Sequence, residues 1–418
     1  MKFSKFGEKL SRRSGILELM EDLSGEASAG ERILMLGGGA PAAVPEAEKM
    51  YRSRMEEILS NGREFENMIG RYCGPEGEKG FISNFCSFMN EVYGLGIENE
   101  NVIVTNGSQS SFFLLFNLLA GEFSGGERKE ILFPLVPEYI GYTDTGLSEN
   151  FFAAHRPEIE EISDHSFHYK IDFDTLPINS YTAALCVSRP TNPTGNVLSP
   201  FDLQKLSAIA GREGIPLIVD GAYGEPFPGI VYENTGLFWD PNMILTFSLS
   251  KVGLPGVRTG IIVANREISQ ALSRMNAVMN LAVGSVGPVL FSELLADGRI
   301  RKLCNESIRP FYQAKRDIAL EIFHDSMNNS LPYFVHRCDG AFFLWVWFRD
   351  IPGGSLDFYK RLKKRGVIIV PGDYYFPGMT DDWRHKKECL RISFAGEEAV
   401  LREGISIIAE EAEKLYNA

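Results

Sequence analysis

Residues 101–120 read NVIVTNGSQSSFFLLFNLLA, and this stretch indicates the fold of the chain. Asn101 to Thr105 is a short apolar run, typical of a buried strand, that ends at Asn106-Gly107-Ser108. Residues 109–120 are then apolar on nearly every face, which predicts a helix inside the protein. A buried strand followed directly by a buried helix is the repeating unit of an α/β sheet.

The alternation of strand and helix continues along the chain. Ser199-Pro200 supplies an N-cap and a proline at the first helical position, so a helix should run from there to Gly211 or Gly214. Alternating elements predict a mainly parallel sheet with helices on both faces. The further predicted strands lie near residues 131–133, 183–187, 215–219, 243–247 and 260–263.

After about residue 295 the pattern changes to amphipathic helix, a short aromatic strand at 342–348, and helix again. We therefore expect a large domain over residues 49–297 and a smaller α+β domain over residues 298–418. The N-terminal residues 1–48 are expected to join the smaller domain.

Composition excludes several classes of protein. The 418-residue chain has a formal net charge of -13, which opposes nonspecific binding to nucleic acid, and its apolar runs are too short to span a membrane. Its six cysteines form no Cys-x-x-Cys pair, which predicts reduced thiols. His165 and His168 lie in an acidic stretch, so we expect them to be solvated and no metal to be bound. Residues 1–8 show no signal-peptide pattern, and we expect a cytoplasmic protein.

Polar clusters follow the ends of the predicted strands. In a mainly parallel sheet these ends share one edge, where ligands bind. The sequence therefore predicts one shared site, built from residues 106–109, 137–139, 189–192, 220–223 and 248–251.

Lys251 lies in the run Ser248-Leu249-Ser250-Lys251, and Arg258 follows seven residues later. Such a set can hold a phosphorylated aldehyde, because the amine forms a Schiff base while the hydroxyls and the guanidinium bind phosphate. Gly107-Ser108-Gln109 opens a helix and offers free backbone N–H groups to the same phosphate. An ordinary N-cap at Ser108 and a surface ion pair of Arg258 are the competing interpretations.

Other strand ends carry the groups that pyridoxal phosphate would need. Asp220 can pair with the ring nitrogen and keep the ring electron-withdrawing. Asn192 and Tyr223 can bind the ring hydroxyl, and Tyr139 can stack on the ring. Taken singly, these residues are also common in turns and in aromatic cores.

Arg391 lies between apolar residues in Leu390-Arg391-Ile392-Ser393. A buried guanidinium suits bidentate binding of a substrate carboxylate, and a buried structural salt bridge is the alternative.

In order and spacing, these runs resemble the class I/II aminotransferases of pyridoxal-phosphate fold type I. The resemblance implies a large domain with a mainly parallel seven-stranded sheet between helices, plus a smaller α+β domain. It assigns Lys251 as the Schiff-base lysine and proton carrier. It also implies that the backbone around Gly39 helps Arg391 to hold the substrate carboxylate. The runs that carry it are Asn192-Pro193-Thr194-Gly195, Asp220-Gly221-Ala222-Tyr223, Ser248 to Gly260 and Arg391-Ile392-Ser393.

The run Tyr72-Cys73-Gly74-Pro75-Glu76-Gly77 is similar to a further segment of the family. The resemblance implies that Tyr72 reaches the phosphate bound by a neighbouring subunit, and hence a homodimer with shared sites. Phe81 and Ile82 stand where the family often has leucine and arginine.

Longer stretches resemble the branch of the family that transaminates between valine and pyruvate. This implies that small amino acids and 2-oxo acids are the substrates, exchanged by a ping-pong reaction. The alternatives are another amino-acid range or C–S lyase chemistry on the same scaffold, and a ligand-sensing regulator. The stretches are Phe6-Gly7, Ser14 to Ile16, Leu19 to Leu23, Leu36 to Gly39, Thr105 to Ser110, Pro137 to Tyr142, Ser188 to Asn196 and Pro226 to Ile230.

Overall fold

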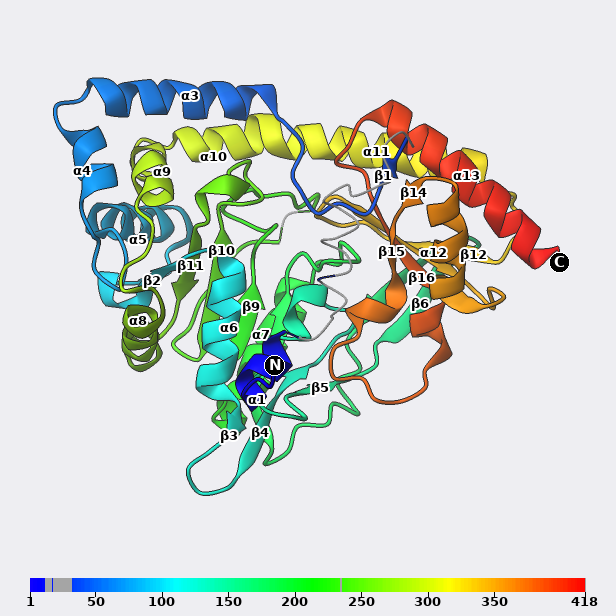
Figure 1. Ribbon diagram of the computed structural model, residues 1–418, viewed down its shortest axis with the longest axis horizontal. Coiled ribbons are helices and arrows are strands. Elements are labelled where there is room, and N and C mark those ends of the chain that lie inside the picture. Colours follow the sequence, from blue (N-terminus) through cyan, green and yellow to red (C-terminus); the bar gives the residue numbers. More distant parts are fainter. Residues whose placement is uncertain (12–16, 18–31, 234, 418) are drawn as a thin grey trace.

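The structure is a computed structural model that describes residues 1–11, 17, 32–233 and 235–417. Two of the stretches quoted above, Ser14 to Ile16 and Leu19 to Leu23, lie outside the described residues. Figure 1 shows two sheets side by side, each covered by helices.

The first sheet has eight strands in the order β2-β11-β10-β9-β8-β4-β3, with β5 also paired to β4. Only β11 and β3 run against the other strands. The mainly parallel sheet expected from the sequence is therefore present, and its eighth strand is the two-residue β3. The strands are β2 (Val102–Thr105), β3 (Gly121–Glu122), β4 (Arg128–Phe133), β5 (Phe152–Ala154), β8 (Thr182–Ser188), β9 (Leu217–Asp220), β10 (Met243–Ser248) and β11 (Gly260–Val263).

Helices pack on this sheet and bury their apolar faces against it. The opening stretch folds as expected, with β2 fully buried and followed by helix α6 (Ser108–Leu119). Helix α7 (Pro200–Glu213) begins at the Ser199 cap and ends at Gly214, which has the left-handed conformation typical of a helix end. The other helices on this sheet are α5 (Lys79–Tyr93), α8 (Arg266–Asn280) and α9 (Val286–Ala296).

The second sheet has six strands in the order β15-β16-β13-β12-β7-β6. Strands β6 and β7 come from the chain between β5 and β8, so the expected division at residue 298 did not anticipate them. The strands are β6 (Glu158–Ser163), β7 (Ser166–Lys170), β12 (Tyr333–His336), β13 (Phe343–Phe348), β15 (Val370–Pro371) and β16 (Cys389–Ser393). The accompanying helices are α11 (Arg309–Ser326), α12 (Gly354–Lys364) and α13 (Glu398–Tyr416).

The placement of β7 corrects the expectation of solvated histidines. His168 is buried and lies 3.2 Å from a carboxylate oxygen of Asp339, because β7 pairs with β12 inside the second sheet. His165 stacks on Tyr333 with ring centroids 4.0 Å apart. Among the described residues, no three His, Cys, Asp or Glu side chains are grouped so that they could hold a metal ion.

The N-terminal part connects the two sheets. Strand β1 (Leu34–Met35) pairs with β14 (Val367–Ile368), and the Ser393 N–H donates to the Leu36 carbonyl at 2.7 Å. The chain then crosses to helix α3 (Pro45–Ser60), which lies over the first sheet (Figure 1). Residues 299–326 form one continuous helix between the two halves, made of α10 (Arg299–Leu303), a π-helical turn (Cys304–Ile308) and α11.

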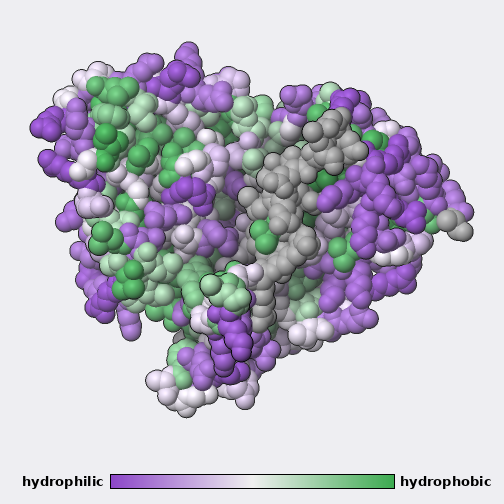
Figure 2. Space-filling view, in the orientation of Figure 1, coloured by the Kyte–Doolittle hydropathy of each residue, from purple (hydrophilic) through white to green (hydrophobic). Residues whose placement is uncertain are grey.

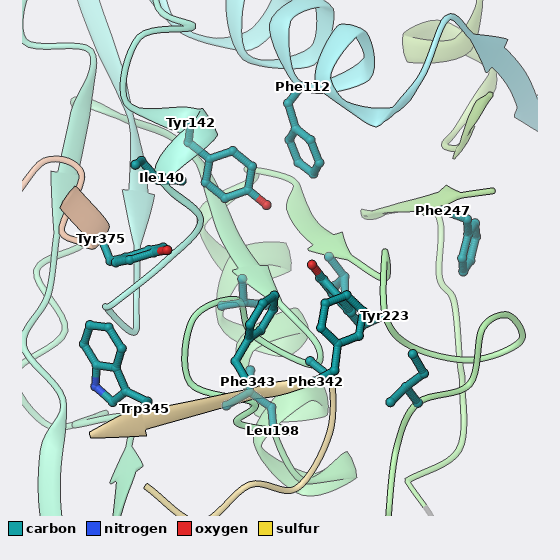
Figure 3. Close-up of a cluster of buried hydrophobic side chains, with 14 of the residues drawn as sticks. Phe112, Ile140, Tyr142, Leu198, Tyr223, Phe247, Phe342, Phe343, Trp345 and Tyr375 are labelled. Carbon is teal, nitrogen blue, oxygen red and sulfur yellow. The ribbon is translucent and has the colours of Figure 1, made fainter. Parts of the chain in front are cut away.

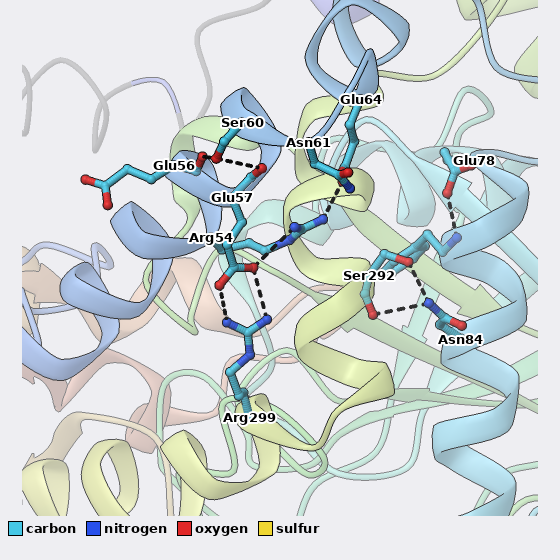
Figure 4. Close-up of polar contacts among 11 residues, drawn as sticks. Arg54, Glu56, Glu57, Ser60, Asn61, Glu64, Glu78, Asn84, Ser292 and Arg299 are labelled. Atoms are coloured by element: carbon cyan, nitrogen blue, oxygen red, sulfur yellow. Dashed lines mark hydrogen bonds and ion pairs between the residues drawn. The ribbon is translucent and has the colours of Figure 1, made fainter.

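A cluster of polar contacts holds the outer helices of the first half together (Figure 4). Arg54 on α3 is only 4% exposed and pairs with Glu57 and with Glu64, the first residue of helix α4 (Glu64–Gly70). Arg299 binds Glu57 at 2.9 Å, which connects α3 to α10. The shorter helices are α1 (Lys5–Leu10), η1 (Asn99–Asn101), η2 (Ile140–Tyr142), η3 (Pro255–Val257), η5 (Gly372–Tyr375) and η6 (Arg384–Lys387).

In the part of the chain that the structure describes, none of the helices combines the length and apolar character that crossing a membrane requires. All six cysteines are free thiols, and only Cys73 is not buried.

Candidate active site

A cavity of about 140 Å³ lies at the carboxyl ends of the parallel strands. Ten of the side chains predicted from the sequence line it, so the polar clusters do converge. The lining residues are Ser108, Gln109, Phe112, Tyr139, Ser188, Pro190, Asn192, Asp220, Ala222, Tyr223, Ser248, Ser250, Lys251 and Arg258.

Lys251 follows β10 and projects into this cavity. Its Nζ donates to the Gly39 carbonyl at 2.6 Å and lies 5.4 Å from the centroid of the Tyr223 ring. Loss of water around the amine lowers the pKa of Lys251 to about 8, and the Arg391 and Arg258 charges act in the same direction. The amine is therefore much closer to neutrality at physiological pH than an ordinary lysine.

The turn before α6 and the turn before β11 meet at one end of the cavity. Gly107 has φ 93°, and a Cβ there would lie 2.3 Å from Nη2 of Arg258, so only glycine fits. Arg258 itself has φ 48°, a backbone strain typical of functional positions, and its Nη1 lies 3.4 Å from Oγ of Ser250. The permanent charge of Arg258 lies beside the free N–H groups at the start of α6. Together they make this end of the cavity suitable for binding an anion.

Asp220 ends β9 in a buried position on the other side of the cavity. Its Oδ1 accepts from the Ala222 N–H at 2.9 Å, and its Oδ2 accepts from the Tyr142 hydroxyl at 2.5 Å. Burial raises the pKa of Asp220, and the bonds from Tyr142 and Ala222 partly oppose that rise. Tyr142 was not predicted as a site residue, although its place three residues after Tyr139 puts both rings on one short helical turn.

Arg391 is 2% exposed on β16 and reaches toward the cavity from the second sheet. Its Nη1 donates to Oδ1 of Asn192 at 2.7 Å and its Nη2 to the Gly37 carbonyl at 2.6 Å, whereas its buried Nε has no partner among the described residues. No described carboxylate forms an ion pair with Arg391, so the alternative of a structural salt bridge has no support among the described residues. A buried cation with an unused donor suits an incoming carboxylate.

Buried aromatic rings from several elements lie together in one cluster (Figure 3). The hydroxyls of Tyr142, Tyr223 and Tyr375 point toward the middle of this cluster. Tyr375, on η5, is fully buried, and its hydroxyl has no partner among the described residues. The Arg391 guanidinium lies 4.3 Å from the Phe343 ring centroid and 5.3 Å from that of Tyr375. Neither Phe343 nor Tyr375 was predicted, because both reach the site only through the packing of the second sheet.

Besides Arg391, three predicted residues lie outside the lining set. Gly107 lies directly behind Arg258, and Gly39 faces Lys251 through its carbonyl, while it is Gly37 that binds Arg391. Tyr72 is 86% exposed and lines a separate cavity of about 630 Å³ beside α4 and α9. Within one chain, Tyr72 is therefore not part of the cavity that holds Lys251.

The arrangement fits a phosphorylated pyridine aldehyde. The Lys251 amine, whose lowered pKa leaves more of it neutral than in an ordinary lysine, can bond to the aldehyde, and the end at Gly107 and Arg258 can take a dianion. Asp220, oriented by two donors, can hold a proton on a ring nitrogen.

Comparison with known proteins agrees with this chemistry. Residues 47–408 match the family described as aminotransferase class I and II. The valine–pyruvate aminotransferase of Escherichia coli is 42% identical over 417 residues, which are 100% of this chain and 99% of that protein. A putative amino-acid aminotransferase from Psychrobacter arcticum has a TM-score of 0.96 at 41% identity, covering 100% of this chain and 99% of that one. The valine-pyruvate aminotransferase AvtA from Salmonella typhimurium has a TM-score of 0.89 at 39% identity, over 96% and 99% of the two chains.

Proposed function

The chain belongs to the class I and II aminotransferases, a family that works with pyridoxal phosphate, and we propose that it exchanges the amino group between L-valine and pyruvate. The products are 2-oxoisovalerate and L-alanine. The observation that carries this proposal is the 42% identity to a valine–pyruvate aminotransferase over the whole of both chains.

When bound, pyridoxal phosphate supplies an aldehyde that combines with amines and a ring that withdraws electrons from the substrate carbon. We assign Lys251 to the aldehyde, Asp220 to the ring nitrogen, and Tyr139 to the ring face. Asn192 and Tyr223 bind the ring hydroxyl. The phosphate is held by Gly107, Ser108, Gln109, Ser248, Ser250 and Arg258, which meet at the end of the cavity described above.

Lys251 also moves the proton. With a pKa of about 8, a useful share of its amine is neutral near pH 7, and this form can take a proton from the substrate α-carbon. The same amine, now protonated, would return that proton on the cofactor side. Water would supply the oxygen of the released 2-oxo acid while the amino group stays on the bound cofactor, and a second 2-oxo acid would take up this amino group and give back the water by the reverse steps.

Arg391 sets the orientation of the substrate. Its guanidinium lies close to the Phe343 and Tyr375 rings and its Nε is unused, so the side chain of a substrate held there by its carboxylate would lie near aromatic surface. Among the described residues that line the cavity, the cations are Lys251 and Arg258, and both already have roles. This supports small apolar side chains over a second carboxylate.

We further infer that the active form is a cytoplasmic homodimer in which Tyr72 reaches the neighbouring subunit's phosphate. Exposed apolar side chains on one side of the first half support a protein interface (Figure 2). They are Leu59, Ile69, Tyr72, Val278, Met279, Leu281 and Val286.

A panel of amino donors against pyruvate and 2-oxoisovalerate tests the proposal, scored by kcat/KM. We expect valine and alanine to exceed aspartate and the aromatic amino acids by about tenfold or more, because a hydrophobic pocket discriminates by that order. The Lys251→Ala variant is the negative control for activity, and it should lose the visible absorbance of bound cofactor. A preference for aspartate would contradict the substrate assignment, and release of ammonia or a side-chain fragment would indicate lyase chemistry.

A further inference from the structure

A chain of buried hydrogen bonds leads from Asp220 away from the cavity to a second carboxyl, that of Glu138. We propose that Glu138 is a positioning residue that acts as a neutral acid and, through Ser188 and Tyr142, orients the hydrogen bond that Asp220 accepts. This inference rests on the proposed role of Asp220 at the cofactor ring.

Glu138 is 1% exposed and is fixed from several sides. Its Oε1 accepts from the Ser188 N–H at 2.7 Å, and its Oε2 contacts the Ser188 hydroxyl. Its own N–H donates to the Tyr375 carbonyl at 2.8 Å, so the turn is also bound to the second sheet. Ser188 is the last residue of β8, directly beside Asp220 in the register of β9.

The chain continues from Ser188 to Asp220. The Ser188 hydroxyl lies 3.3 Å from the Tyr142 hydroxyl, and Tyr142 donates to Oδ2 of Asp220. The series therefore has three side-chain contacts between two carboxyl groups, joined by two hydroxyls.

Counting protons shows that one of the two carboxyls is neutral. Two hydroxyls have two protons, so two ionised carboxylates would each take one and leave none between Ser188 and Tyr142. If Glu138 keeps its proton, it donates to Ser188, Ser188 donates to Tyr142, and Tyr142 donates to Asp220. A proton on Asp220 would reverse all three bonds, so the carboxyl that ionises first decides the direction of the chain.

The charges around Glu138 agree with the proton count. No described cation forms an ion pair with Glu138; the groups that face it are Asp220 on β9, Cys186 on β8 and Tyr142 on η2. Burial and, to a smaller extent, the Asp220 carboxylate raise the pKa of Glu138 to about 8, against the opposing bonds from Ser188. Burial also raises the pKa of Asp220, but the nearby charge of Lys251 opposes that rise, and no described cation does so for Glu138. Asp220 is therefore the member of the pair that ionises first.

The cofactor-loaded protein tests this with Glu138→Met, which removes the donor, and Glu138→Gln, which keeps a neutral donor and an acceptor. The readouts are the affinity for pyridoxal phosphate and the absorbance of the bound cofactor from pH 6 to 10. We expect Glu138→Met to weaken cofactor binding about tenfold and to shift the absorbance titration, because Asp220 loses an oriented donor. Glu138→Gln should restore affinity and spectrum at pH 7 and remove the part of the pH dependence that arises near pH 8.

Glu388→Met is the matched control, since Glu388 is another buried carboxyl that accepts from the Trp347 side chain at 2.8 Å and the Asp350 N–H at 2.9 Å, in the second sheet. It should destabilise the fold and leave the spectrum unchanged. An unchanged titration in Glu138→Met, or a Gln variant that behaves like Met, overturns the proposal. If Glu138→Met does not fold, Ser188→Ala interrupts the same series of hydrogen bonds with a smaller change. An unaltered absorbance titration in that variant also overturns the proposal. A parent protein without cofactor absorbance would instead contradict the proposed function.

Discussion

Arg391 donates a hydrogen bond of 2.7 Å to Asn192, although the two residues are 199 positions apart. Asn192 follows a strand of the first sheet, Arg391 lies within the second, and the Gly37 carbonyl from the N-terminal part binds the same guanidinium. The proposed position of the substrate carboxylate is thus defined by three separate parts of the chain. The packing between the sheets therefore controls the geometry of the site.

Arg391→Lys should lower kcat/KM for valine by about a hundredfold, mainly through KM, because a lysine offers a point charge in place of a two-pronged donor. The cofactor spectrum should stay as in the parent. Arg54→Lys changes another buried arginine, which pairs with Glu57 and Glu64 in the outer helices of the first half, and it should leave KM unaltered. An unchanged KM in Arg391→Lys would contradict the carboxylate role.

Asp220→Asn should retain bound cofactor and turn over roughly a thousandfold more slowly. Asparagine keeps the shape but cannot stabilise a proton on the ring nitrogen, so the ring withdraws electrons less well. Single-turnover measurement with valine separates this chemical step from binding. A rate within a few fold of the parent would refute the assignment of Asp220.

Much of the site could be predicted because each of its polar groups directly follows an apolar strand. The register places Ser188, Asp220 and Thr246 side by side across β8, β9 and β10, so side chains at the strand ends must meet. Tyr142 and Tyr375 could not be identified in this way, because their roles depend on tertiary contacts, and Glu138 was placed in the site cluster without a role. Tyr375, for example, comes to Glu138 through a backbone bond between the two sheets.

The second sheet was harder to predict for a related reason. Val335 of β12 pairs with Ser166 of β7 in parallel, far away in sequence, and no local pattern signals such a partner. The residues between β5 and β8 therefore looked like part of the first domain. The proposed role of Tyr72 involves a second subunit, which a single chain does not contain.

Val278→Asp should convert a dimer into a monomer. Val278 is 88% exposed at the end of α8, among the apolar side chains that we assign to the interface, and a buried unpaired charge there is costly. Light scattering measures the mass directly. If Tyr72 is shared between subunits, the affinity for the cofactor should also fall when the dimer is lost. Phe201→Asp is the control, because Phe201 is 72% exposed on α7 and outside that set. A parent that is already monomeric would contradict the proposed assembly.

The cofactor-free protein should be destabilised by its own Lys251. The pKa of this amine falls from 10.5 to about 8 on folding, so the unfolded chain binds the proton more readily. Folded stability therefore decreases as pH falls from about 10.5 to 8, and below that range the cost is constant at about 3 kcal/mol. Lys251→Met removes the charge, and the cofactor-free variant should unfold at a higher denaturant concentration than the parent at pH 7.

The gain should shrink as pH rises toward 10, because the parent amine is then neutral in both states. The lost bond from Lys251 to the Gly39 carbonyl makes the measured gain smaller than the full value. Lys302→Met changes a lysine that is 73% exposed and should show no such pH dependence. The free energies of unfolding of Lys251→Met and the parent could instead differ by the same amount at pH 7 and pH 10. The charge of Lys251 would then not destabilise the fold, which contradicts a desolvated amine with a lowered pKa.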